Sequence, residues 1–220
     1  MTMSADRSSP IPPPTATRRL TPSDGPLVWI DCEMTGLDVE SDRLLEVACI
    51  ITDGSLAPLD EGVSYVIRTE KAVLDSMNEW CVNQHGKSGL TEACLDEKRA
   101  HQHADVRAAV LAYILDRIPT SGVACLAGNT VHADAAFLKK EMPEITNHLH
   151  YRIVDVSTIK ELVGRWYGDG SRWTGGKGSH RALDDIRGSI EELSHYRRNF
   201  FVMSGSSSNN NNNNSSNNRH

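Results

Sequence analysis

The residues best suited to chemistry are two acids near the start of the chain. Asp31 and Glu33 directly follow the apolar residues 27–30, a run that favours a buried strand. Because side chains alternate faces along a strand, both carboxylates emerge on the same side of it. Removing two like charges from water at the edge of a core is costly, so a cation should lie between them. Ligands that are all oxygen favour magnesium or manganese over zinc.

Two more segments place polar side chains where they could join these acids. Asp134 follows a predicted strand, at the kind of strand end where sheet folds collect their ligands. An acid at the start of a helix can also simply complement the helix dipole, so Asp134 alone leaves both interpretations open. Asp185 lies beside the buried stripe of the last predicted helix, whereas Asp184 is interpreted as a surface acid. His180 precedes that helix, and a histidine in such a place is usually solvated when considered alone.

Taken together, the four acids and the histidine are more specific than any one of them. The carboxylates of Asp31, Glu33, Asp134 and Asp185 could hold two divalent cations about 3.5–4 Å apart, the arrangement for in-line phosphodiester hydrolysis. One cation would position and acidify a water, and the other would stabilise the leaving 3′ oxygen. His180 could accept the proton of that water as general base. This chemistry needs no protein nucleophile.

The hydrophobic pattern predicts the elements that must position these side chains. Three strands at 27–34, 44–52 and 63–68 have short links, which imply antiparallel neighbours. Later elements alternate, and the pattern predicts a helix at 104–118, a strand at 124–127, a helix at 133–142, a strand at 152–156 and helices at 157–166 and 182–199. The predicted fold class is α/β, with a mixed five-stranded sheet, a three-strand antiparallel meander followed by β-α-β, flanked by helices.

Charge and cysteine content limit the partners and the setting. The 220 residues carry a formal charge of −6, which argues against gripping long duplex nucleic acid through a phosphate-neutralising surface. A short anionic substrate remains possible, because bound cations add charge that the sequence does not count. Five cysteines without a CxxC pair indicate a reducing, intracellular setting. No apolar run approaches the roughly 20 residues that span a bilayer, so we expect no membrane partner.

The two ends differ in composition from the middle. Residues 1–25 are rich in Pro, Ser and Thr, and we expect them to be disordered. Their arginines and hydroxyl residues leave a mitochondrial transit peptide open, whereas their aspartates and prolines count against one. The compartment is therefore the cytoplasm, the mitochondrion or both. Residues 204–220 form a Ser/Asn-rich tail, also expected to be disordered, which leaves 26–203 as the folded domain.

Several stretches of the chain resemble the oligoribonuclease family, which belongs to the DEDDh branch of 3′-to-5′ exonucleases with a ribonuclease H-like fold. The stretches are WIDCEMTGLD at 29–38, WCVNQHGKSGLT at 80–91, AGN at 127–129 with Asp134, HLHYRIVDVST at 148–158 and SHRALDDIR at 179–187. The resemblance runs from about residue 27 to 200 and identifies 26–203 as an exonuclease domain. Two departures are Cys32, where the family often has leucine, and the glycine-rich segment 168–178.

The resemblance implies a substrate and the residues that bind it. The substrate would be very short RNA, chiefly dinucleotides, cleaved from the 3′ end to nucleoside 5′-monophosphates. The matching positions are Leu37 as a wedge against a base, Trp80 stacked on it, His85, Arg152 and Ser157 around the 5′ phosphate, and Tyr151 from the second subunit of a homodimer. These residue types suit such roles, since base stacking is worth about 1–3 kcal/mol and a guanidinium can grip phosphate bidentately.

Two other functions remain alternatives. The first is an exonuclease of the same chemistry that acts on longer DNA or RNA, which the negative charge and the cap-like residues disfavour. The second is a non-catalytic RNA-binding protein, which would require the loss of a catalytic position, although all five are present. The sequence does not decide between Mg²⁺ and Mn²⁺, nor does it indicate a base preference.

Overall fold

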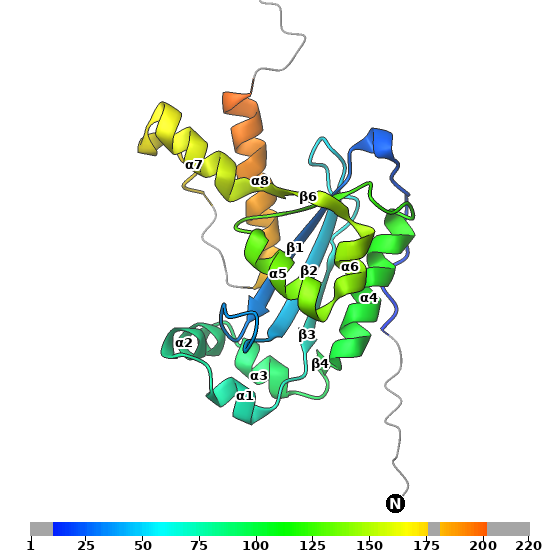
Figure 1. Cartoon of the computed structure of the whole chain (residues 1–220), viewed down its shortest axis with the longest axis vertical. Helices are drawn as coiled ribbons and strands as arrows, with labels where there is room; N and C mark the ends of the chain where they lie inside the picture. Colours follow the sequence, from blue (N-terminus) through cyan, green and yellow to red (C-terminus); the bar gives the residue numbers. More distant parts are fainter. Residues whose placement is uncertain (1–10, 176–180, 202–220) are drawn as a thin grey trace, which may run out of the picture.

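The computed structural model describes residues 11–175 and 181–201. The first ten residues, His180 and the tail at 204–220 therefore lie outside the described residues. In the part of the chain that the structure describes, a six-stranded mixed sheet has the strand order β4-β3-β2-β1-β5-β6. Helices α4, α5 and α6 cover one face of the sheet, and α8 lies on the other (Figure 1).

The strands follow the predicted meander and then the predicted crossovers. Their bounds are Leu27–Met34 (β1), Leu44–Thr52 (β2), Val63–Ile67 (β3), Ala100–His101 (β4), Cys125–Gly128 (β5) and His150–Asp155 (β6). β1, β2 and β3 pair antiparallel, whereas β5 pairs parallel to both β1 and β6. The sequence prediction lacks β4, which adds a sixth strand to the five expected. β4 has only two residues, too few for an alternating pattern, and it pairs with the end of β3.

The helices are more numerous than the sequence pattern predicts. The helices with a predicted counterpart are α4 (His103–Arg117), α5 (His132–Glu141), α7 (Val156–Tyr167) and α8 (Ala182–Phe200). The helices without one are α1 (Lys71–Asp75), α2 (Glu79–Lys87), α3 (Leu90–Leu95), α6 (Pro143–His148) and the 3₁₀ turns Pro22–Asp24 and Asp169–Ser171. Pro143 ends α5 and then begins α6, since a proline at the first helical position leaves no amide unsatisfied.

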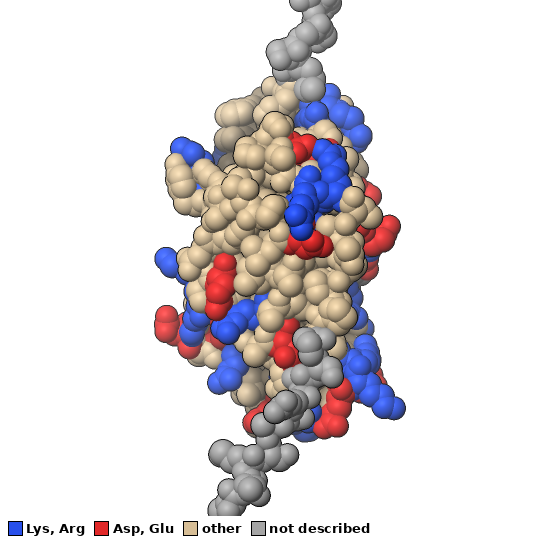
Figure 2. Space-filling model, turned by 90° about the vertical axis from the view of Figure 1, so that its right-hand side faces the viewer, with Lys and Arg blue, Asp and Glu red and all other residues tan. Residues whose placement is uncertain are grey.

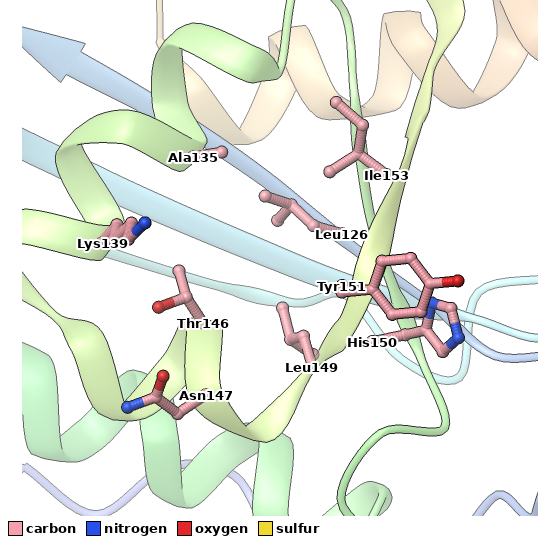
Figure 3. A pocket seen from close by; sticks show the side chains of 9 residues that line it. All are labelled: Leu126, Ala135, Lys139, Thr146, Asn147, Leu149, His150, Tyr151 and Ile153. Atoms are coloured by element: carbon pink, nitrogen blue, oxygen red, sulfur yellow. The ribbon is translucent and has the colours of Figure 1, made fainter.

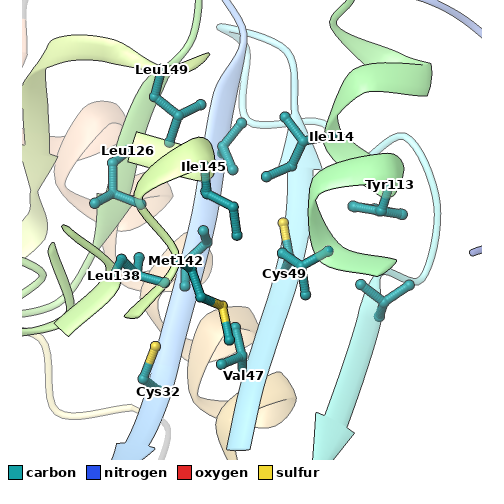
Figure 4. Packing of buried hydrophobic residues seen from close by; sticks show 14 of the residues in the cluster. Cys32, Val47, Cys49, Tyr113, Ile114, Leu126, Leu138, Met142, Ile145 and Leu149 are labelled. Atoms are coloured by element: carbon teal, nitrogen blue, oxygen red, sulfur yellow. The ribbon is translucent and has the colours of Figure 1, made fainter. Parts of the chain in front are cut away.

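The two faces of β1 have different surroundings. Val28, Ile30 and Cys32 point into the core formed with α4, α5 and α6, in which Figure 4 shows Cys32 near the side chains of that face. Trp29 points to the other face and packs with the buried stripe of α8. Cys32 thus lies on the face opposite the two acids of β1, as its position between them predicts.

Residues 11–25 differ from the disorder expected of them. Leu20 is buried, and its amide donates to the carbonyl oxygen of Arg117 over 2.7 Å. Arg117 is fully buried, and its guanidinium donates to the carbonyl oxygen of Pro14 and to the carboxylate of Asp60. The composition of this segment hid these contacts, because several of them use backbone groups, which no side-chain pattern reveals.

The surface shows no sign of a continuous basic groove on the face that Figure 2 presents. Basic and acidic side chains alternate there over a mostly uncharged surface. Among the described helices, none combines the length and the apolar character needed to cross a membrane.

Candidate active site

The acidic cluster is built where β1 ends and α8 begins. Asp31 and Glu33 share one face of β1, and Asp185 lies in the first turn of α8, which packs across that face. One carboxylate oxygen from each of the three residues lies within 4.8 Å of the others. The structure therefore brings together three acids that are up to 154 positions apart in the sequence (185 − 31).

Asp134 reaches the same place from the other side of β1. It lies in the first turn of α5 and is only 6% exposed. The backbone amide of Cys32 donates to its Oδ1 atom over 2.9 Å. Because Cys32 stands between Asp31 and Glu33, this hydrogen bond fixes Asp134 against the same segment of β1. The fourth predicted carboxylate is thus adjacent to the cluster, although it is not in the tightest group of three.

Burial and mutual repulsion make these carboxylates poor acids. Burial, followed by the charges of Asp134 and Glu33, raises the pKa of Asp31 to about 9. Burial, followed by the charge of Glu46, raises the pKa of Glu33 to about 8. Burial raises the pKa of Asp134 to about 7, while the hydrogen bond from the Cys32 amide opposes it. The raised pKa values show that the described neighbours do not balance the charge of these carboxylates, and oxygen-only donors are the kind that hard divalent cations bind.

His85 lies beside Glu33 rather than in the open. It is 2% exposed, and its Nε2 atom is 2.9 Å from the carbonyl oxygen of Met34. Its Nδ1 atom is 3.8 Å from Glu33 Oε2. The histidine comes from α2, whose start is capped by the Asn78 side chain accepting from the amide of Cys81. In this arrangement the side chain that the resemblance assigns to the 5′ phosphate adjoins a carboxylate of the cluster.

Leu37 and Trp80 are exposed, as a base-binding wedge and platform require. Their side chains are 78% and 65% exposed. Leu37 stands on a loop held by Asp42, which accepts a hydrogen bond from Thr35 Oγ over 2.7 Å. A Cβ on Gly36 would lie 2.3 Å from Asp42 Oδ2, so the loop needs glycine there. A large apolar side chain held in water on a fixed loop has no role in this chain's own core.

Tyr151 and Arg152 lie at the other end of the sheet. Both are on β6, the edge strand, where the Tyr151 ring stacks on that of His150 (Figure 3). The Arg152 guanidinium is 4.6 Å from the centre of the Tyr151 ring. Through β5, the strand register places His150 level with Leu27 and Ile153 level with Val28, and Tyr151 and Arg152 lie in the register shift between them. Asp31 is three to four residues farther along β1 than these levels, which is about 10–13 Å of strand. One chain therefore does not bring Tyr151 or Arg152 to its own acids.

Ser157 lies at the start of α7, near the end of β6. Its Oγ atom donates to Asp155 Oδ1 over 2.5 Å, and the same oxygen accepts the amide of Thr130 over 2.9 Å. Asp155 also lies 3.3 Å from the Nδ1 atom of His132. This aspartate joins α7 to the loop that leads to Asp134, a role that the sequence pattern did not assign to it. His180, the predicted general base, lies outside the described residues.

Sequence reasoning missed a buried ion pair next to the cluster. Glu46 of β2 is 1% exposed and stands directly opposite Glu33 in the sheet. Both of its oxygens accept from the guanidinium of Arg181, over 2.9 and 3.1 Å, and Oε1 also accepts from Ser64 Oγ over 2.7 Å. The only signal in the sequence was an acid inside an otherwise apolar predicted strand.

A second buried carboxylate connects α8 to the loop before α5. Glu192 is 4% exposed and accepts from Asn129 Nδ2 over 2.9 Å and from the Tyr196 hydroxyl over 2.9 Å. The Lys160 ammonium lies 3.3 Å from the same side chain. The helix that carries Asp185 is thus held by polar contacts at its start and again near its middle.

The comparison with solved structures shows the class of fold. An exonuclease I from Methylocaldum szegediense superposes with a TM-score of 0.60 at 18% identity, over 80% of this chain and 41% of that one. The exonuclease I of E. coli, in a complex with single-stranded DNA, gives a TM-score of 0.60 at 13% identity. This chain spans about two fifths of the length of those proteins, so the likeness shows the fold alone. The fold is therefore of the ribonuclease H-like class, which these exonucleases share.

The comparison with sequences gives the family. The family described as Exonuclease matches residues 28–193. A probable oligoribonuclease of Schizosaccharomyces pombe is 56% identical over 172 residues, which cover 78% of this chain and 67% of that protein. The human mitochondrial oligoribonuclease is 49% identical over 80% of this chain and 73% of its own. The oligoribonuclease of Halorhodospira halophila is 44% identical over 81% of this chain and 96% of its own. The chain therefore belongs to the oligoribonuclease family, and it is a 3′-to-5′ exoribonuclease.

Proposed function

We propose that this protein degrades very short RNA, chiefly dinucleotides, from the 3′ end to nucleoside 5′-monophosphates. The observation that carries the proposal is the convergence of Asp31, Glu33 and Asp185 within 4.8 Å, with Asp134 hydrogen-bonded to the strand between them. The name oligoribonuclease, printed for relatives that match about four fifths of the chain, supports a short RNA substrate.

The four carboxylates would hold two divalent cations, Mg²⁺ or Mn²⁺. When bound, these cations would lower the pKa of the attacking water and stabilise the charge that develops on the phosphate. The pKa values of Asp31 and Glu33, raised to about 9 and about 8, support such a role, because carboxylates buried together need positive charge. Asp134 would be kept in place by its hydrogen bond from the Cys32 amide.

The remaining residues would place the substrate and move its proton. His180 would accept the proton of the attacking water as general base. Leu37 and Trp80 would hold a base between them, and their exposure leaves both free to make that contact. His85, Arg152 and Ser157 would surround the 5′ phosphate, which a longer RNA could not pass.

Tyr151 would complete that cap from a second copy of the chain in a homodimer. The register of β6 supports this assignment, since Tyr151 lies about 10–13 Å of strand away from the level of Asp31 in its own chain. Its 79% exposure and its place on an edge strand also leave it available to a partner. We further propose an intracellular location, in the cytoplasm, the mitochondrion or both, since several relatives are named as mitochondrial.

A digestion series tests the proposal. RNAs labelled at the 5′ end, from two to about twenty nucleotides long, are incubated with the protein and Mg²⁺, and kcat/KM is measured at each length. We expect the dinucleotide to be cleaved fastest, with a steep fall as the 5′ extension grows, because the cap would exclude it. Equal rates at all lengths would remove the short-substrate proposal, and a preference for long single-stranded DNA would favour the alternative exonuclease.

A further inference from the structure

The buried ion pair between Glu46 and Arg181 has no place in the proposed chemistry. Glu46 is 1% exposed, and the side chain of Arg181 is 34% exposed. The contact is bidentate, with Arg181 Nη2 donating to Oε1 over 2.9 Å and Nε donating to Oε2 over 3.1 Å. Taking such a pair out of water usually costs as much as the attraction returns, so its stability alone does not explain it.

The position of the pair relates it to the acidic cluster. Glu46 is the direct cross-strand neighbour of Glu33, so both side chains rise from the same face of the sheet. Arg181 is the residue immediately before α8, and its carbonyl oxygen accepts from the amides of Asp184 and Asp185, over 3.0 and 3.2 Å. A short path of hydrogen bonds therefore runs from β2 through Arg181 to the residue that carries the third carboxylate of the cluster.

Among the described residues, the first turn of α8 also makes two more peripheral contacts, through the partly buried side chain of Leu183 and the exposed ion pair of Asp184 with Arg187. The buried stripe of the helix is Ala182, Ile186 and Ile190, which pack with Ala48 and Ile50. The member of this stripe in the first turn is an alanine, which buries far less apolar area than the two isoleucines that follow. A planar guanidinium held by two parallel hydrogen bonds restrains both the height and the rotation of the turn, which an alanine contact does not.

We infer that Glu46 and Arg181 are positioning residues, which fix the first turn of α8 so that Asp185 meets Asp31 and Glu33 in the geometry that divalent cations require. The inference rests on the proposed two-cation site. Residues that orient metal ligands typically change metal affinity or activity by about 10–100-fold when they are replaced.

The test compares Arg181→Met, Arg181→Lys and Glu46→Gln with a matched control, Arg187→Met. Arg187 is on the same helix and forms exposed ion pairs with Glu61 and Asp184. The first measurement is the affinity for Mn²⁺, which is determined by electron paramagnetic resonance. We expect Arg181→Met to weaken binding by about 10–100-fold. Arg181→Lys should recover only part of this loss, because an ammonium cannot make the bidentate contact, and Arg187→Met should bind as the original does.

The second measurement is amide hydrogen exchange in protein stripped of metal. The amides of Asp184 and Asp185 should exchange at least about 10-fold faster in the Arg181 variants, while amides of β1 and β2 stay unchanged. The third is the Mg²⁺ dependence of dinucleotide hydrolysis, in which the half-saturating Mg²⁺ concentration should rise more than KM for the dinucleotide. Lower kcat at an unchanged Mg²⁺ requirement would indicate another role.

Each outcome separates this inference from the proposed function. If the Arg181 variants bind Mn²⁺ and exchange as Arg187→Met does, the inference is wrong, whatever the enzyme cleaves. If the original protein binds Mn²⁺ but does not cleave short RNA, the proposed function is wrong, and the binding and exchange data still decide on Arg181. Should Arg181→Met fail to fold, Arg181→Lys and Glu46→Gln make the same comparison with less disturbance.

Discussion

The two regions that the proposed reaction needs differ in how far one chain completes them. At the end of β1, acids from this strand and from the first turns of α5 and α8 come together, and the Cys32 amide holds one of them, Asp134. On β6, Tyr151 and Arg152 contact each other at an exposed edge and no acid of the cluster. This difference supports the proposal that one chain carries the hydrolytic site and that a second chain completes the cap on the substrate.

The largest expected effect is on the acidic cluster. Asp31→Asn should lower the rate of dinucleotide hydrolysis by at least about 10³-fold, because it removes a proposed cation ligand at the scissile bond. The metal-free variant should be as stable as the original or more stable, since one of several buried like charges is gone. Thermal unfolding and hydrolysis rates check both effects. Asp184→Asn is the control, and retained hydrolysis by Asp31→Asn would contradict the assignment.

The next prediction mixes two inactive proteins. Tyr151→Ala should lose the cap, and Asp31→Asn should lose the chemistry, so each protein alone is slow. If Tyr151 acts across a two-fold dimer, half of the dimers in an equal mixture are mixed and each has one complete site, which restores about a quarter of the original rate. Rates are measured after the subunits have been unfolded and refolded together.

The mixture has a clear control and a clear contrary result. Tyr167→Ala, which removes another exposed tyrosine, should be as active as the original by itself. A mixture of Tyr151→Ala and Asp31→Asn that is no faster than the sum of its parts would place Tyr151 outside the partner's site. The acidic cluster and the β6 edge would then no longer differ in their need for a second chain.

A smaller effect is expected at the proposed stacking platform. Trp80→Ala should raise KM for a dinucleotide by about 10–100-fold, the equivalent of about 1–3 kcal/mol of base stacking. Steady-state kinetics on several dinucleotides measure it, and the effect should depend little on which base is present. Trp166→Ala is the matched control, because Trp166 is 69% exposed and Trp80 is 65% exposed. An equal change in both variants would argue against a platform at Trp80.

The smallest effect is the pH dependence of stability without metal. The pKa values of Asp31 and Glu33 are raised on folding, so the folded protein binds more protons than the unfolded chain between about pH 4 and pH 9. Their contribution to the free energy of unfolding is therefore present at low pH and lost as the pH rises through about 8 and about 9. Urea unfolding from pH 5 to pH 9 measures it. The free energy of unfolding should change less steeply with pH in Asp31→Asn than in the original protein. A steeper change would contradict the raised pKa assigned to Asp31.

Much of the fold could be predicted from local pattern. β1 and β2 have the predicted bounds, and α8 differs from its prediction by one residue, because long apolar runs and helical stripes specify both type and length. The predicted strand at 152–156 lies instead at His150–Asp155, since a short edge strand has little buried pattern. Helices α1, α2 and α3 and strand β4 were not predicted, because five to nine residues, or two, carry too weak a period.

Part of the candidate site was predictable from local pattern as well. Alternation along β1 places Asp31 and Glu33 on one face whatever the rest of the chain does. The partner of Glu46 was not predictable, because Arg181 is 135 positions away and only the packing of α8 on β2 joins them. The burial of His85 against Glu33 depends on the docking of α2, which no local pattern of the chain specifies.

The order of the residues specifies which side chains share a face, because backbone periods of two and of about 3.6 residues act over short distances. It thereby determined the acids of β1, the stripe of α8 and the family resemblance. Only the tertiary structure decided the partner of each buried charge, the fixed place of residues 11–25 and the distance of Tyr151 from the acids. Those depend on strand register and helix docking, in which groups far apart in the chain meet because each leaves water only when it is paired.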